Sequence, residues 1–134
     1  MKTSPISLAF EKAKLEKRPA LLTYIVAGDN TKLKSIEILK SISKNVDICE
    51  IGFPHNTPIA DGGQIQTSSF RALNNGIKIN DVFNIVKKFK NIKKHIPVIL
   101  MGYYNIILQF GENNFINKCK RTGVNGIIVV DLPY

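Results

Sequence analysis

The sequence contains few residues of the kinds that bind metals or form disulfides. Its 134 residues include two cysteines and two histidines. Cys49 and Cys119 are far apart in apolar-periodic segments, with no C-x-x-C pair and no histidine at ligand spacing. Isolated cysteines of this kind predict buried free thiols rather than a disulfide or a zinc site. We therefore expect no metal centre.

Long hydrophobic runs and nucleotide-binding glycine motifs are also absent. No apolar run approaches the roughly 20 residues that a membrane helix needs, and residues 1–12 lack the unbroken apolar stretch of a signal peptide. Neither G-x-G-x-x-G nor a glycine-rich loop ending in Gly-Lys-Ser/Thr occurs. The 44% hydrophobic and 22% charged residues are typical of a soluble globular protein. We expect one domain over residues 1–134, in the cytoplasm and without a membrane partner.

Acidic residues are scarce relative to basic ones. Ten acids against 19 lysines and arginines give a net charge of +9, which can indicate nucleic-acid binding. Three of the 19 are arginines, the residue whose fork suits phosphate and base edges. The densest lysine cluster, residues 87–94, alternates with the apolar face of a predicted helix, as a solvated face does. We expect no nucleic-acid partner and keep a non-catalytic basic binding domain as an alternative.

Helical and strand patterns alternate along the chain. Apolar runs at residues 20–27, 46–51, 97–101 and 126–130 predict four strands. Apolar residues recur at helical spacing in residues 4–17, 33–42, 63–75, 82–92 and 112–121. We expect Ser4-Pro5 to start the first helix, Asn80 or Asp81 to cap the fourth, and residues 102–105 to form a loop. Connections of this length make the strands parallel.

The predicted fold class is therefore α/β, and the pattern is compatible with two architectures. A flavodoxin-like sheet would be complete at this size, but it would normally end on a helix that covers its last strand. This sequence ends one residue after Asp131-Leu132-Pro133. That ending favours the N-terminal half of a (βα)8 TIM barrel, a fold of about 250 residues. The half would consist of an extra N-terminal helix and about four parallel strands with intervening helices.

Two carboxylates converge between residues 47 and 66. Glu50 ends the second predicted strand, and Asp61 closes the loop after it. Side chains at the carboxyl ends of parallel strands face the crevice where ligands bind. Apolar surroundings should raise the pKa of Glu50, which suits a general acid/base, and Asp61 could accept a hydrogen bond from an N–H or hydroxyl group. The structural alternative is that Glu50 pairs with a lysine and Asp61 caps the helix starting near Gly63.

Three further side chains are weaker candidates. Tyr24 and Tyr103, near the ends of two predicted strands, could line a pocket, although tyrosines there are about as often part of a core. His55 lies in the acidic loop, where a single histidine is more often solvated than catalytic.

One long string resembles a family signature. Residues 50–66, E-I-G-F-P-x-x-x-P-I-A-D-G-G-x-I-Q, closely resemble the signature of the tryptophan synthase alpha chain. Supporting strings are TYIVAGD at residues 23–29, LMGYYN at residues 100–105 and GVNGIIVVDLP at residues 123–133. The resemblance covers the chain in order and with the family's spacing.

The resemblance implies a lyase of tryptophan biosynthesis. The family cleaves indole-3-glycerol phosphate by a retro-aldol reaction, which gives indole and glyceraldehyde 3-phosphate. Glu50 would match the general acid/base, and Asp61 would match the carboxylate that binds the indole N–H. The positions at which the family lines its indole pocket would be Tyr24, Leu100, Tyr103, Ile128 and Val130.

The resemblance also implies a partner. The family forms an alpha2beta2 heterotetramer with a beta chain that carries pyridoxal phosphate, so no cofactor is expected on this chain. The family's partner-contacting loop corresponds to Pro54, His55, Asn56, Thr57 and Pro58. Where the family usually has Phe-Ser-Asp, this chain has His55-Asn56-Thr57, so an acid is missing at Thr57. Gly63 stands where the family usually has proline, which makes the loop more flexible.

Related phosphate-binding barrels, of the indole-glycerol-phosphate synthase or phosphoribosylanthranilate isomerase type, are alternatives with the same architecture. The pairing of Glu50 with the A-D-G loop favours the alpha chain. The family binds phosphate with loops after strands seven and eight, which this length does not reach. We therefore expect a fragment with two unpaired strand edges and little activity alone.

Overall fold

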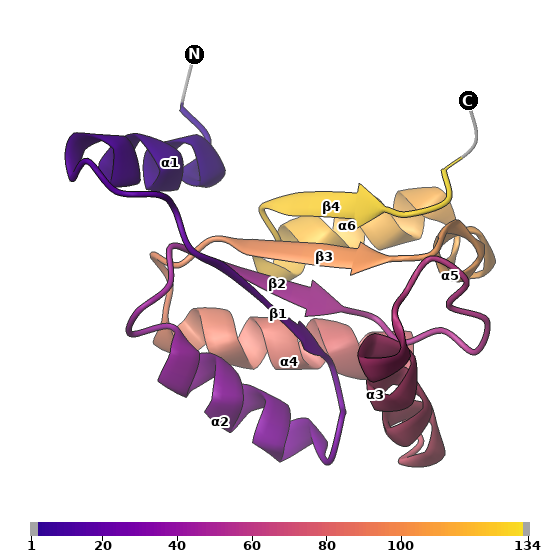
Figure 1. Cartoon of the computed structure of the whole chain (residues 1–134). Helices are drawn as coiled ribbons and strands as arrows, with labels where there is room; N and C mark the ends of the chain where they lie inside the picture. The colour runs from indigo at the N-terminus through magenta and orange to yellow at the C-terminus, as the bar shows by residue number, and fades with distance from the viewer. Residues whose placement is uncertain (1–2, 133–134) are drawn as a thin grey trace.

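Four parallel strands lie in chain order, β1-β2-β3-β4, in the computed structural model, which describes residues 3–132. The strands are β1 (Leu22–Val26), β2 (Ile48–Gly52), β3 (Val98–Gly102) and β4 (Gly126–Val129). The helices are α1 (Pro5–Leu15), α2 (Lys32–Ile42), α3 (Gly63–Asn74), α4 (Ile79–Ile92), α5 (Tyr104–Phe110) and α6 (Glu112–Thr122). The four arrowheads point the same way, so the carboxyl ends of the strands share one edge (Figure 1).

The four predicted strands are confirmed, with bounds shifted by one or two residues. The start of α1 is also as predicted, because the Ser4 side chain accepts a hydrogen bond from the backbone N–H of Ser7 at 3.1 Å. The cap residue after the last helical residue of α6 is Gly123, as predicted, and its φ of +88° is readily adopted by glycine. Local sequence signals therefore determine most element boundaries.

Two predictions about helices are wrong. α4 begins at Ile79 after the cap residue Lys78, so Asp81 lies inside the first turn, where its side chain accepts a hydrogen bond from Lys78 N at 3.0 Å. Residues 102–105 are not a loop, since β3 ends at Gly102 and α5 starts at Tyr104. The cap residue of α5, Tyr103, makes no side-chain cap hydrogen bond, and the N–H of Tyr104 instead donates to Asp131 Oδ1 at 2.7 Å. This cap comes from the segment after β4, so the sequence around α5 carries no local start signal.

Helices α2, α4 and α6 cover one face of the sheet (Figure 1). Alternate strand residues point to this helix-covered face. Cys49, Ile51, Val98 and Leu100 there are 0% exposed. They pack in one apolar core with residues of the helices, among them Leu39, Val82, Val86, Phe89 and Phe115. This face holds most of the buried apolar side chains and therefore most of the stabilising apolar burial.

The opposite face is the inner face. α1 packs over its amino-terminal half (Figure 1), where a Cβ built at Gly126 would lie 2.9 Å from Ile6. The half near the carboxyl ends is open, and Ile128 there is 41% exposed. Within residues 3–132, β1 and β4 each pair with a single neighbour, so both outer edges of the sheet are unpaired as predicted. No helix in that range is long and apolar enough to cross a membrane.

Candidate active site

Glu50 lies in the middle of β2, on the inner face. Its register partners are Tyr24 on β1 and Ile99 on β3, so these three side chains form one row across the sheet. Glu50 is partly buried, and none of the ion pairs in the described part of the chain involves it. Burial raises the pKa of its carboxyl group, in the direction predicted. A raised pKa favours the protonated form of a carboxyl group, which a general acid needs.

Asp61 lies at the end of the loop after β2. Its backbone N–H donates to the carbonyl of Pro58 at 3.0 Å, and its carbonyl accepts a hydrogen bond from Gln66 at 2.8 Å. The Tyr103 hydroxyl donates to its Oδ2 at 3.2 Å. The cap residue of α3 is Gly62, and no side chain caps this helix. Asp61 therefore does not serve as the helix cap that the structural alternative required, and no hydrogen bond from residues 3–132 reaches its Oδ1.

Tyr24 connects the two carboxylates. Its pKa is raised first by burial and then by the negative charges of Asp61 and Glu50. Tyr24 is in register with Glu50 on the inner face, and Ile65, four residues after Asp61, lines a cleft together with Tyr24. Gly52 leaves room for the Tyr24 side chain, because a Cβ at position 52 would overlap the Tyr24 hydroxyl.

The inner face also carries two of the predicted pocket residues on β4 and just after it. Ile128 is in register with Met101, which is in register with Gly52. Val130 follows β4, is half-buried, and donates its N–H to the carbonyl of Gly102 at 3.0 Å. Ile128 and Val130 therefore lie on the same face as Tyr24 and Glu50, closer to the carboxyl ends of the strands.

Leu100 does not lie with them, and this prediction is contradicted by the sheet geometry. Its register partner on β2 is Ile51, and both side chains are 0% exposed on the helix-covered face. Because side chains alternate along a strand, a shift of one residue changes the face. Ile99 and Met101 are the residues of β3 on the inner face, and Met101 is the one nearer the carboxyl ends of the strands. Identifying it required the register between β2 and β3, which the sequence does not show.

The segment of residues 54–58 has a buried frame and an open tip. Pro54 and Pro58 are buried, and Asn56 and Thr57 are exposed. His55 is half-buried, and its ring centroid lies 5.0 Å from that of Tyr103, with 31° between the ring planes. Of the five residues predicted to contact a partner, Asn56 and Thr57 present the most surface.

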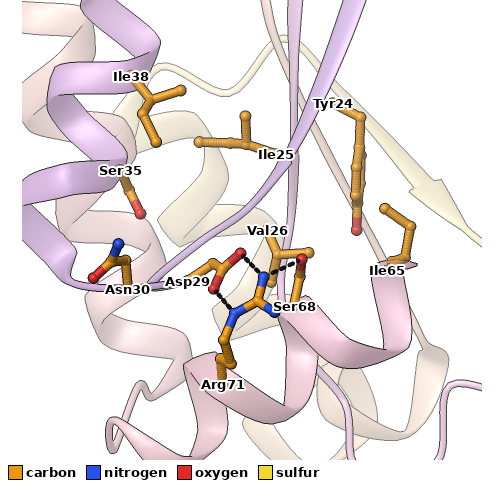
Figure 2. A pocket seen from close by; sticks show the side chains of 10 residues that line it. All are labelled: Tyr24, Ile25, Val26, Asp29, Asn30, Ser35, Ile38, Ile65, Ser68 and Arg71. Atoms are coloured by element: carbon orange, nitrogen blue, oxygen red, sulfur yellow. Dashed lines mark hydrogen bonds and ion pairs between the residues drawn. The ribbon is translucent and has the colours of Figure 1, made fainter. Parts of the chain in front are cut away.

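A cleft of about 460 Å³ lies beside the site, at the edge of β1 (Figure 2). It shares Tyr24 with the site, but neither Glu50 nor Asp61 lines it. Inside it, Arg71 of α3 donates two hydrogen bonds to Asp29, at 2.7 and 2.8 Å, and one to Ser68 at 3.1 Å. The Arg71 guanidinium lowers the pKa of Asp29. This contact ties the turn after β1 to α3. Its partners are 42 positions apart, so no local pattern in the sequence predicts it.

The cysteines are not arranged for metal binding. Cys49 and Cys119 are free and buried, as predicted, and burial raises the pKa of each thiol to about 11. No three His, Cys, Asp or Glu side chains within residues 3–132 are grouped so that they could hold a metal ion.

The sheet that carries Glu50 and the following loop that carries Asp61 can be compared with known proteins. The family model described as "Tryptophan synthase alpha chain" matches residues 10–134. This chain belongs to that family. It is 75% identical over 131 residues to "Tryptophan synthase alpha chain" of Pelagibacter ubique (strain HTCC1062), which covers 98% of this chain and 49% of that protein. It is 45% identical over 125 residues to "Tryptophan synthase" of Saccharomyces cerevisiae, which covers 92% of this chain and 18% of that protein.

Solved structures of alpha chains have the same fold. Tryptophan synthase subunit alpha from Legionella pneumophila superposes with a TM-score of 0.94 at 36% identity, over 98% of this chain and 50% of that one. A chain of the "tryptophan synthase a2b2 complex" from Pyrococcus furiosus superposes with a TM-score of 0.82 at 43% identity, over 85% of this chain and 48% of that one. The chain thus spans about half the length of the alpha chains it matches. Its four parallel strands and their helices match half of the family's TIM barrel, which confirms the predicted family and fold class.

Proposed function

We propose that this chain carries the acid–base half of a tryptophan synthase alpha active site, which cleaves indole-3-glycerol phosphate into indole and glyceraldehyde 3-phosphate. The observation that supports it best is the placement of the two carboxylates: Glu50 lies beside Tyr24 on the inner face, and Asp61 accepts a hydrogen bond from the Tyr103 hydroxyl at 3.2 Å. Glu50 is the general acid/base, and Asp61 binds the indole N–H. Residues 1–134 act as one unit, a partial barrel.

The reaction needs one carboxyl group that exchanges protons and one that stays charged. Glu50 protonates ring carbon C3, which gives an indolenine cation that Asp61 stabilises through its N–H. Glu50 then takes the proton of the adjacent glycerol hydroxyl while the carbon–carbon bond breaks. The bonding electrons return to the ring, and the hydroxyl carbon becomes the aldehyde. One proton is given and one is taken, so Glu50 ends as it began.

The open half of the inner face provides the apolar contacts for indole. Tyr24, Tyr103, Ile128 and Val130 keep the roles that the resemblance implies, and Met101 takes the role first given to Leu100. The exposed tip of the segment of residues 54–58 contacts a beta chain, which carries pyridoxal phosphate. The cellular location that we propose is the cytoplasm.

Because the chain spans about half the length of its relatives, the test supplies the other half. Residues 1–134 are joined to the remaining half of the Pelagibacter ubique relative, which is 75% identical in the shared part. Indole release from indole-3-glycerol phosphate is then measured for this completed barrel. Glu50→Gln should abolish turnover and leave folding intact, and Asp61→Asn should lower kcat by about 100-fold or more, as loss of a transition-state charge contact does.

Glu37→Gln is the matched control. The Glu37 side chain lies on α2, is 54% exposed, and pairs with Lys34, so its loss should leave turnover unchanged. Retained turnover in Glu50→Gln would refute the role of Glu50.

A further inference from the structure

We propose that His55 is a positioning residue that orients Asp61 through the ring of Tyr103. The inference rests on the proposed function, because it concerns how Asp61 is presented to the indole N–H. His55 and Asp61 belong to the same loop, and Tyr103 comes from the junction of β3 and α5. The loop contacts Tyr103 at two places, with the His55 ring on the phenol ring and with residues 60–61 at the hydroxyl.

The hydrogen bonds of the Tyr103 hydroxyl have a fixed direction. The backbone N–H of Ala60 donates to this oxygen at 2.9 Å, so the hydroxyl is the acceptor there. A phenol has one hydrogen to donate, and the Tyr103 hydroxyl directs it to Asp61 Oδ2 at 3.2 Å. The position of the phenol therefore sets which carboxylate oxygen is occupied and leaves Oδ1 for the ligand.

The phenol ring is in turn held by its neighbours. Tyr103 is 4% exposed, and the His55 ring lies on it with centroids 5.0 Å apart. This distance is in the range where aromatic rings attract each other beyond simple apolar burial. His55 is followed by the exposed Asn56 and Thr57, whose side chains form a hydrogen bond with each other at 3.3 Å and with no other side chain of residues 3–132. Within this segment, His55 is thus the residue that transmits loop position to the ring.

The test separates this contact from the reaction itself. Amide hydrogen exchange of Ala60, followed by NMR in the completed barrel, reports the bond to the Tyr103 hydroxyl without any turnover. His55→Ala should speed Ala60 exchange by about three- to tenfold, the effect of losing one ring contact. His55→Phe keeps an aromatic face and should restore exchange to within about twofold of the wild type. Tyr103→Phe removes the hydroxyl and sets the upper limit of the effect.

His95→Ala is the matched control, because this second histidine is exposed before β3, at the opposite end of the strands. It should change neither Ala60 exchange nor turnover. His55→Ala should lower kcat by about the factor by which Ala60 exchange rises, and His55→Phe should recover it.

Three outcomes would overturn the proposal: unchanged Ala60 exchange in His55→Ala, faster exchange throughout the protein, or a local exchange effect with no change in kcat. Turnover that survives Glu50→Gln would instead refute the proposed function, and the Ala60 result would still decide whether His55 holds the ring.

Discussion

The two faces of the sheet differ in how completely their side chains are buried and paired. On the helix-covered face, Ile51 and Leu100 are 0% exposed and contact other apolar side chains. On the inner face, Glu50 has no ion pair within residues 3–132, and Ile128 is 41% exposed. Side chains that are not already paired or buried within the fold are the ones that a ligand can contact. The comparison therefore places most of the stabilising apolar burial on one face and the candidate site on the other.

Two acids of one chain segment show the same contrast. The Asp47 side chain, just before β2, is 7% exposed and accepts hydrogen bonds from Arg18 at 2.7 and 2.8 Å and from the N–H of Leu21 at 2.8 Å. These contacts hold its pKa at about 2. Burial without such partners raises the pKa of Glu50. Asp47 is thus a structural carboxylate, whereas no ion pair within residues 3–132 holds Glu50 in its charged form.

Neighbouring residues on β3 offer the strongest way to break the comparison. Leu100→Ala should lower the free energy of unfolding by about 2–5 kcal/mol, because it leaves a cavity in a packed core. Met101→Ala is the matched control: it removes a side chain of similar size from the open inner face and should cost less than about 1.5 kcal/mol, whereas it should weaken substrate binding in the completed barrel. Urea denaturation of both variants measures the difference. Equal losses would show that the faces do not differ as described.

A pH series on Asp47 sharpens the comparison between the two acids. Because its folded-state pKa of about 2 lies below the unfolded value of about 3.9, its contribution to stability is present above pH ~4 and is lost as the pH falls toward 2. Asp47→Asn should destabilise the fold by about 1–3 kcal/mol at pH 6, as loss of charge-assisted hydrogen bonds does, and by much less at pH 2. Urea denaturation at the two pH values gives both numbers. A destabilisation that does not depend on pH would contradict the role of this ion pair.

Glu50 should show the opposite sign. Its folded-state pKa is raised, so its contribution to stability is present below the unfolded pKa and is lost as the pH rises through the folded one.

The sequence predicted the architecture because periodicity and caps are local. The four strands, the Ser4 cap and the Gly123 stop depend on neighbouring residues alone. The two carboxylates are also predicted from local features, an apolar run and a proline-bounded loop, although Glu50 lies in the middle of β2 and not at its end. What the sequence did not show depends on register or on long-range contacts. Leu100 was assigned to the wrong face by one position, and the first N–H of α5 donates to Asp131, 27 positions later in the chain.

The contact of His55 with Tyr103 belongs to the same class. These rings come from segments 48 positions apart in sequence and meet only because β2 and β3 are neighbours in the sheet. Composition and spacing carry no trace of such a pair, so it required the structure.

The smallest expected effect concerns the ion pair between Arg71 and Asp29, which lies at the edge of β1 and belongs to neither face. The Arg71 side chain is 54% exposed, and exposed ion pairs typically contribute about 0.2–1 kcal/mol. Arg71→Lys keeps the charge but cannot reproduce the two parallel hydrogen bonds to Asp29, so it should lower stability within that range, measured by urea denaturation at low and at high salt. Arg121→Lys on α6, where no ion pair forms within residues 3–132, is the matched control and should change nothing. A loss above about 2 kcal/mol in Arg71→Lys would mean that the docking of α3, and with it the position of Asp61, depends on this edge contact and not on the inner face.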